Sequence, residues 1–399
     1  MPRFLPFRGL RYSPAHLSSL DDVVCPPYDV ISPTERLALE ARSPYNVVRV
    51  ELPQPDGDTD PYRRAATLLD SWRDGGIVRR DPEAAFYGYR MTFTDPDGAP
   101  RSTVGVIGAL ELEPPGDGIL PHEETTPKAK TDRMELLRAT RVNTSPIWGL
   151  SPASGLSARL TPPATPAEHV TDGDGVAHQL WPIADPVAVA AIRAAVESQP
   201  VLIADGHHRF ETALAYQEER AGGPPGSAGE DLVMALIVEL RAEQLTVQAV
   251  HRLLSGLPGG FDLPEALAPW FDVTPTGPPD RTIGARMGDA GAMAVLTLSG
   301  AWLARPRPGV TAAASHDLDS SRLDVALASL PAHHVTYQHG WATCAAAVAT
   351  GQADAAVLLR PAAIDQIGAI ARGGIRMPPK TTYFWPKPRT GMVLRELLG

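Results

Sequence analysis

Short apolar runs alternate along this chain with segments in which apolar residues recur every three or four positions. The short runs predict buried or half-buried strands, and they lie at 47–52, 84–94, 103–112, 147–150, 201–203, 232–240, 292–298 and 354–359. The periodic segments predict amphipathic helices, and they lie at 33–42, 61–75, 132–141, 188–197, 319–328 and 342–350. Because strands and helices alternate, the pattern predicts an α/β or α+β fold with a mixed sheet.

Polar residues mark several of the predicted element ends. Ser32-Pro33-Thr34-Glu35 is a capping box with proline at the first helical position. Asp132 and Glu135 have the spacing of a capping pair, which places a helix start there. Asp95-Pro96-Asp97-Gly98 separates two strand-like runs and predicts a hairpin turn.

The 399 residues are enough for two or three packed units. The pattern divides into a region 1–150, a region 151–255 that contains the segment Asp-Gly-His-His-Arg, and a region 256–399 that ends in a polar, basic and aromatic segment. The same pattern also fits one continuous compact unit.

Composition narrows the class of protein. The formal net charge of −10 argues against a general surface for nucleic acids or anionic membranes. The two cysteines, Cys25 and Cys344, form neither a disulfide framework nor a zinc-type spacing. No apolar stretch approaches the ~20 residues that span a bilayer, and the first residues do not resemble a secretory signal. We therefore expect a cytoplasmic protein.

The segment 204–209, Ala-Asp-Gly-His-His-Arg, is the most informative in the chain. It follows the apolar run 201–203 and precedes a helical pattern, so it predicts a strand, a tight glycine turn and the first turn of a helix. A helix N-terminus has N–H groups without intrahelical partners and carries partial positive charge. Such a turn suits an anion, and phosphate above all.

The side chains of this segment extend the same expectation. Arg209 offers a planar fork that grips two phosphate oxygens, and His207 and His208 titrate near neutral pH. Asp205 and Gly206 complete the predicted phosphate-binding or nucleotide-binding turn. In the alternative interpretation, Asp205 only caps the helix, Gly206 only forms the turn, and the histidines lie on the surface.

Other candidate residues lie in the first 150 positions. Glu123 lies in an acidic loop before a helix, where it could act as a general base or hold Mg²⁺, and His122 beside it is a candidate substrate contact. Tyr28 and Asp29 follow two prolines that aim them rigidly, and with Arg133 they are further candidates for substrate contact. The alternatives are a solvated loop, a hydrogen bond to turn backbone and a surface charge.

The last candidates follow residue 250. His251 and Arg252 end an apolar segment and are candidate substrate contacts, or satisfied structural residues. Lys380, Thr381 and Lys387 are flanked by three aromatic residues, a combination that suits phosphate and a stacked base. A docking C-terminal tail would have the same composition.

Several common catalytic motifs are absent from the sequence. It contains no G-x-x-x-x-G-K-[ST], no G-x-G-x-x-G, no H-E-x-x-H and no G-x-S-x-G. Nothing therefore indicates a P-loop enzyme, a Rossmann dehydrogenase, a zincin or an α/β-hydrolase.

The segments CPPYDVIS, HEETT, IADGHHRFETALAY, HRLL and MPPKTTYFWPKPRTG resemble, in this order, the bacterial and archaeal DUF1015 family. That family is named for its unassigned function. The order of a Glu-containing loop, helix, strand, D-G-H-H-R and helix is also similar to the ParB/sulfiredoxin superfamily, which includes free-serine kinases. This second resemblance implies a ParB/sulfiredoxin-like core elaborated by further strands and helices.

The second resemblance also implies roles for individual residues. Gly206, His207, His208 and Arg209 would hold nucleotide phosphates, and Glu123 would be the base. The chain departs from the superfamily because the gap from Glu123 to the turn is longer than in the compact kinases. Sulfiredoxin's reactive cysteine has no counterpart, since a histidine occupies that neighbourhood, so sulfiredoxin activity is not expected.

Together these features predict an enzyme that is a small-molecule kinase. It would use ATP or ADP with Mg²⁺ to phosphorylate a small hydroxylated metabolite, with free L-serine or a similar amino acid as the expected acceptor. Two alternatives stay open. One is a nucleotide-binding, ParB-like switch without kinase chemistry, and the other is a phosphoester hydrolase.

Overall fold

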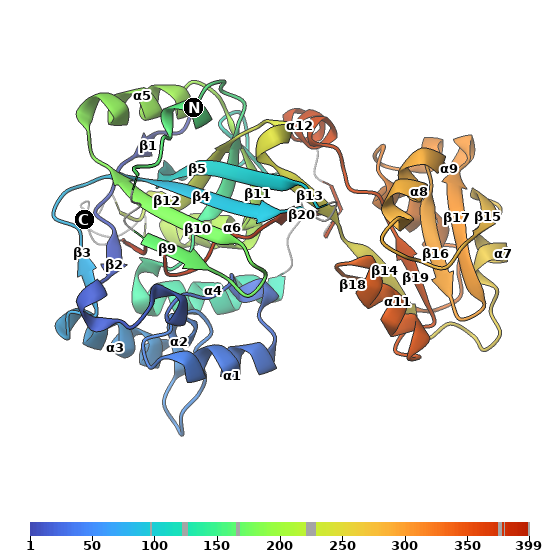
Figure 1. The fold of residues 1–399 in the computed structure, drawn as a ribbon, viewed down its shortest axis with the longest axis horizontal. Coiled ribbons are helices and arrows are strands. Elements are labelled where there is room, and N and C mark those ends of the chain that lie inside the picture. Colours follow the sequence, from blue (N-terminus) through green and yellow to red (C-terminus); the bar gives the residue numbers. More distant parts are fainter. Residues whose placement is uncertain are drawn as a thin grey trace. The chain divides into compact units, whose positions relative to one another are not determined.

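The computed structural model describes residues 1–95, 98–121, 127–164, 168–220, 229–373, 377–378 and 380–397. The chain divides into two compact units (Figure 1). The first comprises residues 1–246, 371–374 and 386–399, and the second comprises 247–370 and 375–385. The second unit is therefore inserted, along the sequence, into the first. Residues 1–150 and most of 151–255 fall together in the first unit, and the three regions expected from the sequence stay a prediction.

The first unit is built on a mixed sheet, which has nine strands within the described ranges. They are β1 (Phe4–Leu5), β4 (Phe86–Thr94), β5 (Pro100–Glu111), β6 (Ile119–Pro121), β8 (Ile147–Ser151), β9 (Glu168–Thr171), β10 (Ala177–Ile183), β11 (Val201–Asp205) and β12 (Leu232–Glu239). The order is β6-β11-β8-β12-β5-β4-β10-β9, with β1 against β5. The pairs β6–β11 and β8–β12 are parallel and the others antiparallel, which confirms the predicted fold class.

The first unit also contains helices. They are α1 (Pro33–Arg42), α2 (Val48–Glu51), α3 (Pro61–Asp74), α4 (Pro127–Thr140), α5 (Pro186–Val196) and α6 (His207–Arg220). In Figure 1, α1, α3 and α4 lie on one side of the strands and α5 on the other. Ser32 caps α1, because its hydroxyl accepts the Glu35 N–H, and Asp60 and Asp185 cap α3 and α5 in the same way. The core contains Val106 and Ile203 from the sheet and Phe210 from α6.

Two short strand pairs complete the first unit. They are β2 (Leu10–Tyr12) with β3 (Val78–Arg80), and β7 (Val142–Asn143) with β21 (Arg395–Glu396). The second pair fastens the end of the chain to the unit. The guanidinium of Arg395, 3 % exposed, donates to the carbonyls of Leu232 and Gly229 at 2.9 Å each.

Two predicted elements differ from the structure. The run 47–52 was expected to be a strand but forms helix α2, because the Asn46 side chain accepts the Val48 N–H at 3.0 Å and donates to the Asp22 carbonyl at 2.8 Å. The helix expected from Asp132 begins earlier, at Pro127. Asp132 is therefore not a cap, and its carboxylate instead accepts the Tyr62 hydroxyl at 2.9 Å.

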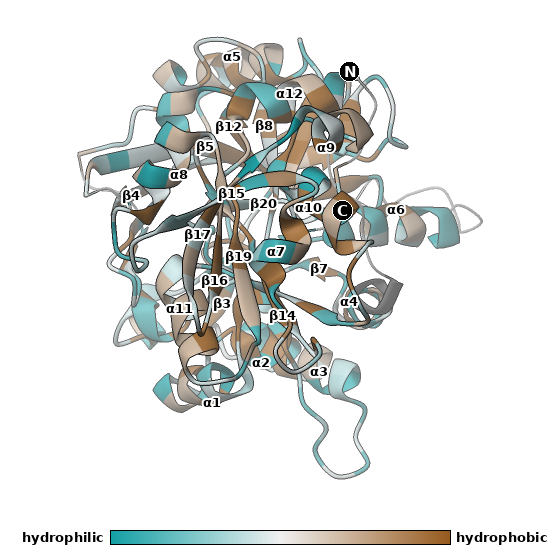
Figure 2. Ribbon diagram, turned by 90° about the vertical axis from the view of Figure 1, so that its right-hand side faces the viewer, coloured by the Kyte–Doolittle hydropathy of each residue, from teal (hydrophilic) through white to brown (hydrophobic). Residues whose placement is uncertain are grey.

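The second unit has a sheet of six described strands, in the order β15-β17-β16-β19-β14-β18. They are β15 (Phe271–Thr276), β17 (Gly300–Pro306), β16 (Met293–Thr297), β19 (Ala355–Leu358), β14 (His251–Ser255) and β18 (His334–Gln338). The accompanying helices are α7 (Leu263–Leu267), α8 (Ile283–Ala290), α9 (Pro308–Ala313), α10 (Asp319–Leu327), α11 (Trp341–Ala349) and α12 (Ile364–Arg372). Strands β13 (Thr246–Ala249) and β20 (Thr382–Trp385) pair with each other. Figure 2 colours the central strands β16 and β19 brown, as expected for strands buried on both faces.

No helix in the described part of the chain is long and apolar enough to cross a membrane.

Candidate functional site

The segment 204–209 forms the predicted strand, turn and helix start. Strand β11 ends at Asp205, Gly206 has φ +87°, and α6 begins at His207. A Cβ atom at Gly206 would lie 3.1 Å from the Cα of Ile147 and 3.0 Å from the guanidinium of Arg209. Glycine is therefore required here by both the left-handed backbone and the close approach of β8.

We expect Gly206→Ala to destabilise the first unit by more than the ~1–2 kcal/mol that a left-handed backbone costs a residue with a Cβ. Gly98→Ala is the matched control, because Gly98 also has φ +87° but has nothing within 4 Å of its added Cβ. Thermal unfolding of both variants separates the backbone cost from the contact with Ile147. Equal losses would contradict the contact.

Asp205 lies between two cations. Its carboxylate forms an ion pair with the Lys387 ammonium and a second with the Arg209 guanidinium at 2.9 Å. The three side chains are 17 %, 8 % and 12 % exposed, respectively. Burial alone would raise the pKa of Asp205, but Lys387 and Arg209 together hold it well below its usual range. Residues 182 positions apart in the sequence thus form one charged cluster.

Arg209 connects this cluster to the residues just before strand β8. Its guanidinium donates to the Ser145 hydroxyl at 2.8 Å and to the Pro146 carbonyl at 2.6 Å. Its Nε atom is buried and has no hydrogen-bond partner in the structure. His207 and His208 lie beside it in the first turn of α6, and His207 is close enough to Asp205 to favour the ionised carboxylate. The Arg209 guanidinium, which was expected to bind phosphate, is thus held in place by Ser145, Pro146 and Asp205.

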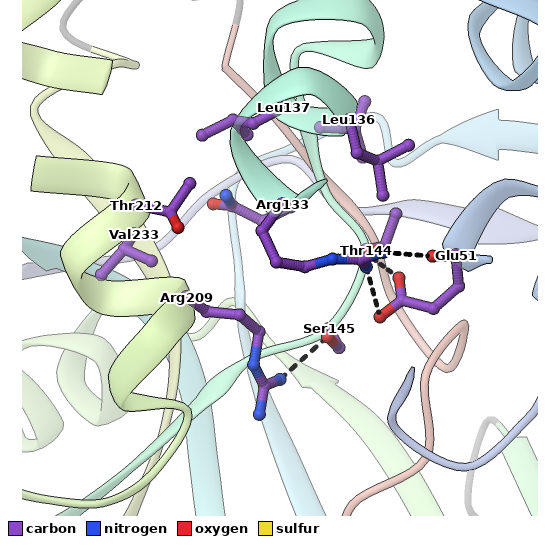
Figure 3. A pocket seen from close by; sticks show the side chains of 11 residues that line it. Glu51, Arg133, Leu136, Leu137, Thr144, Ser145, Arg209, Thr212 and Val233 are labelled. Atoms are coloured by element: carbon purple, nitrogen blue, oxygen red, sulfur yellow. Dashed lines mark hydrogen bonds and ion pairs between the residues drawn. The ribbon is translucent and has the colours of Figure 1, made fainter. Parts of the chain in front are cut away.

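A small cavity of about 50 Å³, lined by both polar and apolar side chains, lies beside the turn within the first unit (Figure 3). Arg209 from α6 and Arg133 from α4 both line it, together with Glu51, Thr144, Ser145 and Thr212, among others. Buried polar atoms without a hydrogen-bond partner occur on three of these residues: Oε1 of Glu51, Nε of Arg209 and Oγ1 of Thr212. Since a buried water needs about 10–15 Å³, the cavity has room for a few waters or one small polar group.

Arg133 is the second buried cation of the cavity. Its guanidinium lies 3.5 Å from the Glu51 carboxylate, 2.5 Å from that of Asp132 and 4.3 Å from the ring centroid of Tyr28. The Thr144 hydroxyl donates to the other oxygen of Glu51 (Figure 3). Burial raises the pKa of Tyr28 to about 12, against the opposing charge of Arg209. Tyr28, Arg133 and Arg209 thus belong to one neighbourhood.

The structure brings together one set of predicted site residues in the first unit, namely Tyr28, Arg133, Asp205, Gly206, His207, Arg209 and Lys387. Asp29 lies beside Tyr28 but is exposed. His122 and Glu123, the predicted substrate contact and base, lie outside the described residues.

The predicted residues that follow position 250, except Lys387, belong to the second unit. The Nδ1 of His251 accepts the Leu359 N–H at 3.2 Å, and burial lowers the pKa of this ring to about 4. Arg252 donates to the Lys380 carbonyl at 3.1 Å, and Thr381 donates to the Pro378 carbonyl at 2.8 Å. Each of these bonds is internal to the second unit.

Sequence reasoning missed Glu51, Thr144 and Thr212, which nothing local in the sequence distinguishes. The distribution of lysine along the sequence, however, does indicate which segments matter. The chain has 36 basic residues, of which only four are lysine, and these are Lys128, Lys130, Lys380 and Lys387. All four lie in the HEETT…K and MPPKTTYFWPK segments. A chain that otherwise uses arginine has lysine only where the recognisable motifs are.

Among the described residues, no group of three or more His, Cys, Asp and Glu side chains is placed to hold a metal ion. Both oxygens of the Asp205 carboxylate form ion pairs with cations, one with Lys387 and the other with Arg209.

Comparisons with known proteins give a family and distant structural similarities. The model of the family described as "Protein of unknown function (DUF1015)" matches residues 4–326. No curated protein matches the chain. The free serine kinase in complex with AMP is 13 % identical, with a TM-score of 0.38 over 70 % of this chain and 86 % of that one. A conserved hypothetical protein from Pyrococcus furiosus is 14 % identical (TM-score 0.39, 73 % and 95 % covered), and C-terminally truncated SbnI from Staphylococcus aureus is 11 % identical (TM-score 0.39, 71 % and 85 % covered).

Proposed function

The chain belongs to the DUF1015 family, as its sequence motifs predict, and because that family has no assigned function we propose one from the residues around Asp205. The protein is a nucleotide-dependent phosphotransferase that acts on a small hydroxylated metabolite. The observation that carries this proposal is the convergence of Lys387 and Arg209 on Asp205 at the start of α6.

This cluster suits phosphoryl transfer because the reaction depends mainly on positioning and charge neutralisation. The ammonium and the guanidinium are both nearly buried and are held by protein groups, so they need little rearrangement when charge develops on a transferring group. The start of α6 adds backbone N–H groups that have no intrahelical partner. In the free protein Asp205 compensates the two cations, and nucleotide phosphates would take over that role.

The cavity supplies a place for the polar part of the acceptor. Its size excludes a nucleotide but suits a small charged group. Arg133 is chemically matched to a carboxylate and Glu51 to an ammonium, which favours an amino acid such as free L-serine. Glu123 would accept the proton of the acceptor hydroxyl. Mg²⁺, bound through the nucleotide phosphates, would supply further charge neutralisation.

The direct test is to incubate the purified protein with ATP or ADP, Mg²⁺ and a panel of hydroxylated amino acids, and to follow products by ³¹P NMR. We expect a new phosphomonoester signal with one member of the panel. Neither nucleotide turnover nor a phosphorylated product across the panel would count against the proposal.

We expect Glu123→Gln to lower turnover by at least about a hundredfold, the usual contribution of a general base, while leaving nucleotide affinity nearly unchanged. The matched control is Glu124→Gln, which removes an identical charge from the next residue. Initial rates and calorimetric nucleotide titrations of both variants provide the measurement. A larger loss of turnover in Glu124→Gln would show that the base is misassigned.

The Lys387–Asp205 ion pair favours one second candidate, a nucleotide-binding switch without kinase chemistry. Phosphates that displace Asp205 from Lys387 would release a contact between the segment 386–390 and the end of β11, which is the kind of change a switch requires. Calorimetric binding of nucleotide without any product in the same NMR assay would favour this candidate.

A further inference from the structure

Lys387 is held by an unusual stretch of backbone. It lies between Pro386 and Pro388, two residues that fix φ and have no N–H group. The first backbone donors after Lys387 are therefore those of Arg389 and Thr390. Thr390 pairs with Cys25 through two backbone hydrogen bonds, at 2.9 and 3.2 Å. The N–H of Arg389 has a different partner, and that partner is a side chain.

The partner is the phenol of Tyr89 on strand β4. The Arg389 N–H donates to the Tyr89 hydroxyl at 3.0 Å, and this hydroxyl lies 2.9 Å from Nδ1 of His178 on β10. The other ring nitrogen of His178, Nε2, lies 3.1 Å from the Asp172 carboxylate. Tyr89 is 1 % exposed and His178 is fully buried. Asp172 is itself held by the N–H groups of Asp174 and Val176 at 2.9 and 3.0 Å.

The directions of these hydrogen bonds are fixed by one another. Asp172 accepts as a carboxylate, so the neutral ring of His178 carries its proton on Nε2 and donates it to Asp172. Nδ1 therefore has no proton, and the Tyr89 hydroxyl, which accepts from Arg389, donates its own proton to Nδ1. Burial lowers the pKa of His178, which agrees with the neutral ring that this arrangement needs. The backbone N–H of Arg389, the Tyr89 hydroxyl, both ring nitrogens of His178 and the Asp172 carboxylate thus each have a partner.

We propose that Tyr89, His178 and Asp172 are positioning residues that hold the segment 386–390 so that Lys387 reaches Asp205. Their significance for nucleotide binding rests on the proposed function, whereas their effect on Lys387 does not. The series begins at the hairpin of β9 and β10 and ends two residues after Lys387. It therefore connects the far edge of the main sheet to the proposed phosphate site within one unit.

The test uses Tyr89→Phe and, as its matched control, Tyr87→Phe. Tyr87 lies on the same strand and also accepts a backbone N–H, that of Gly9 at 2.7 Å, while donating to Asp81 at 2.7 Å. Its bonds do not involve the segment 386–390. The accessibility of Lys387 is measured as the rate of its labelling by an amine-reactive ester, with the other three lysines as internal references. We expect about a tenfold faster labelling of Lys387 in Tyr89→Phe only.

Nucleotide affinity is measured on the same proteins by calorimetry with ATP and ADP. A roughly tenfold weaker affinity in Tyr89→Phe, with Tyr87→Phe unchanged, supports both the positioning role and the nucleotide site. Faster labelling in a protein that binds neither nucleotide supports the positioning role and counts against the proposed function. Equal labelling of Lys387 in the two tyrosine variants overturns the inference.

A second pair of variants tests the series independently of Tyr89. Glutamine at position 178 keeps one acceptor and one donor, whereas phenylalanine keeps neither. His178→Gln should therefore retain slower labelling of Lys387 than His178→Phe. The same rate in both variants, with both chains folded by circular dichroism, contradicts a hydrogen-bonded role for the histidine.

Discussion

Replacing Asp205 with alanine should lower the free energy of unfolding of the first unit by about 3–5 kcal/mol. The reason is that the substitution leaves two nearly buried cations, Lys387 and Arg209, without their shared carboxylate. Hydrogen exchange of amides in β11 and α6, together with urea unfolding, measures the loss where it occurs. The double variant Asp205→Ala with Lys387→Met should recover part of it, because it removes one of the unpaired charges.

Glu219→Ala is the control for this prediction. Glu219 forms a close ion pair with Arg138 in the same unit, but both side chains are 42 % exposed. Exposed pairs contribute little, so this variant should unfold nearly as the natural protein does. If the two variants behave alike, or if removing Lys387 worsens the loss, the Asp205 cluster is not a buried charge network.

The same cluster predicts a direction for the effect of pH. The pKa of Asp205 is lower in the folded protein than in the unfolded chain, so its contribution to stability is fully present above the unfolded pKa of about 3.9. That contribution is lost as pH falls through the folded pKa. The difference in unfolding free energy between the natural protein and Asp205→Ala should therefore shrink below about pH 4. A difference that grows on acidification would contradict the assignment.

Arg209→Met should lower turnover of the proposed phosphotransferase by about a thousandfold, the scale of an arginine that neutralises a transferring phosphoryl group. The size of this effect follows from the position of Arg209, which forms part of both the Asp205 cluster and the cavity wall. Methionine keeps most of the packing volume while removing the charge. Single-turnover rates with the acceptor identified by NMR provide the measurement.

The control is Arg11→Met. Arg11 is also largely buried and forms ion pairs with two carboxylates, Asp81 at 2.6 Å and Glu168 at 2.8 Å, but it does not line the cavity. Its loss should cost stability without a comparable change in turnover per folded molecule. Similar losses of turnover in both variants would indicate that the effect of Arg209 is structural.

The sequence predicts those parts of the site that depend only on neighbouring residues. An apolar run followed by Asp-Gly-His-His-Arg is enough to place β11, a left-handed glycine and the start of α6, because strand burial and turn chemistry are local properties. The Ser32 cap of α1 and the β4–β5 hairpin were predictable for the same reason, because short local sequences specify them. The sequence also marked Lys387 as a candidate phosphate contact, but it did not indicate that Asp205 is its partner.

Long-range contacts explain what could not be predicted. The valine-rich run 47–52 has the composition of a strand, but the Asn46 side chain anchors it as a helix by accepting the Val48 N–H and donating to the distant Asp22 carbonyl. That helix places Glu51 beside Arg133. Because the run was predicted as a strand, Glu51 could not be recognised as a residue that lines the cavity. The Tyr28–Arg133 stack and the Lys387–Asp205 pair likewise depend on segments that meet only in the folded protein.

The insertion of the second unit affects when the site can form during synthesis. The ribosome makes residues 247–385 before it reaches Lys387, although Asp205 and Arg209 were completed long before. Until residues 387–396 emerge, Asp205 and Arg209 lack Lys387, and β7 lacks its partner strand β21. A chain terminated inside the second unit would therefore fold without the complete Asp205 cluster.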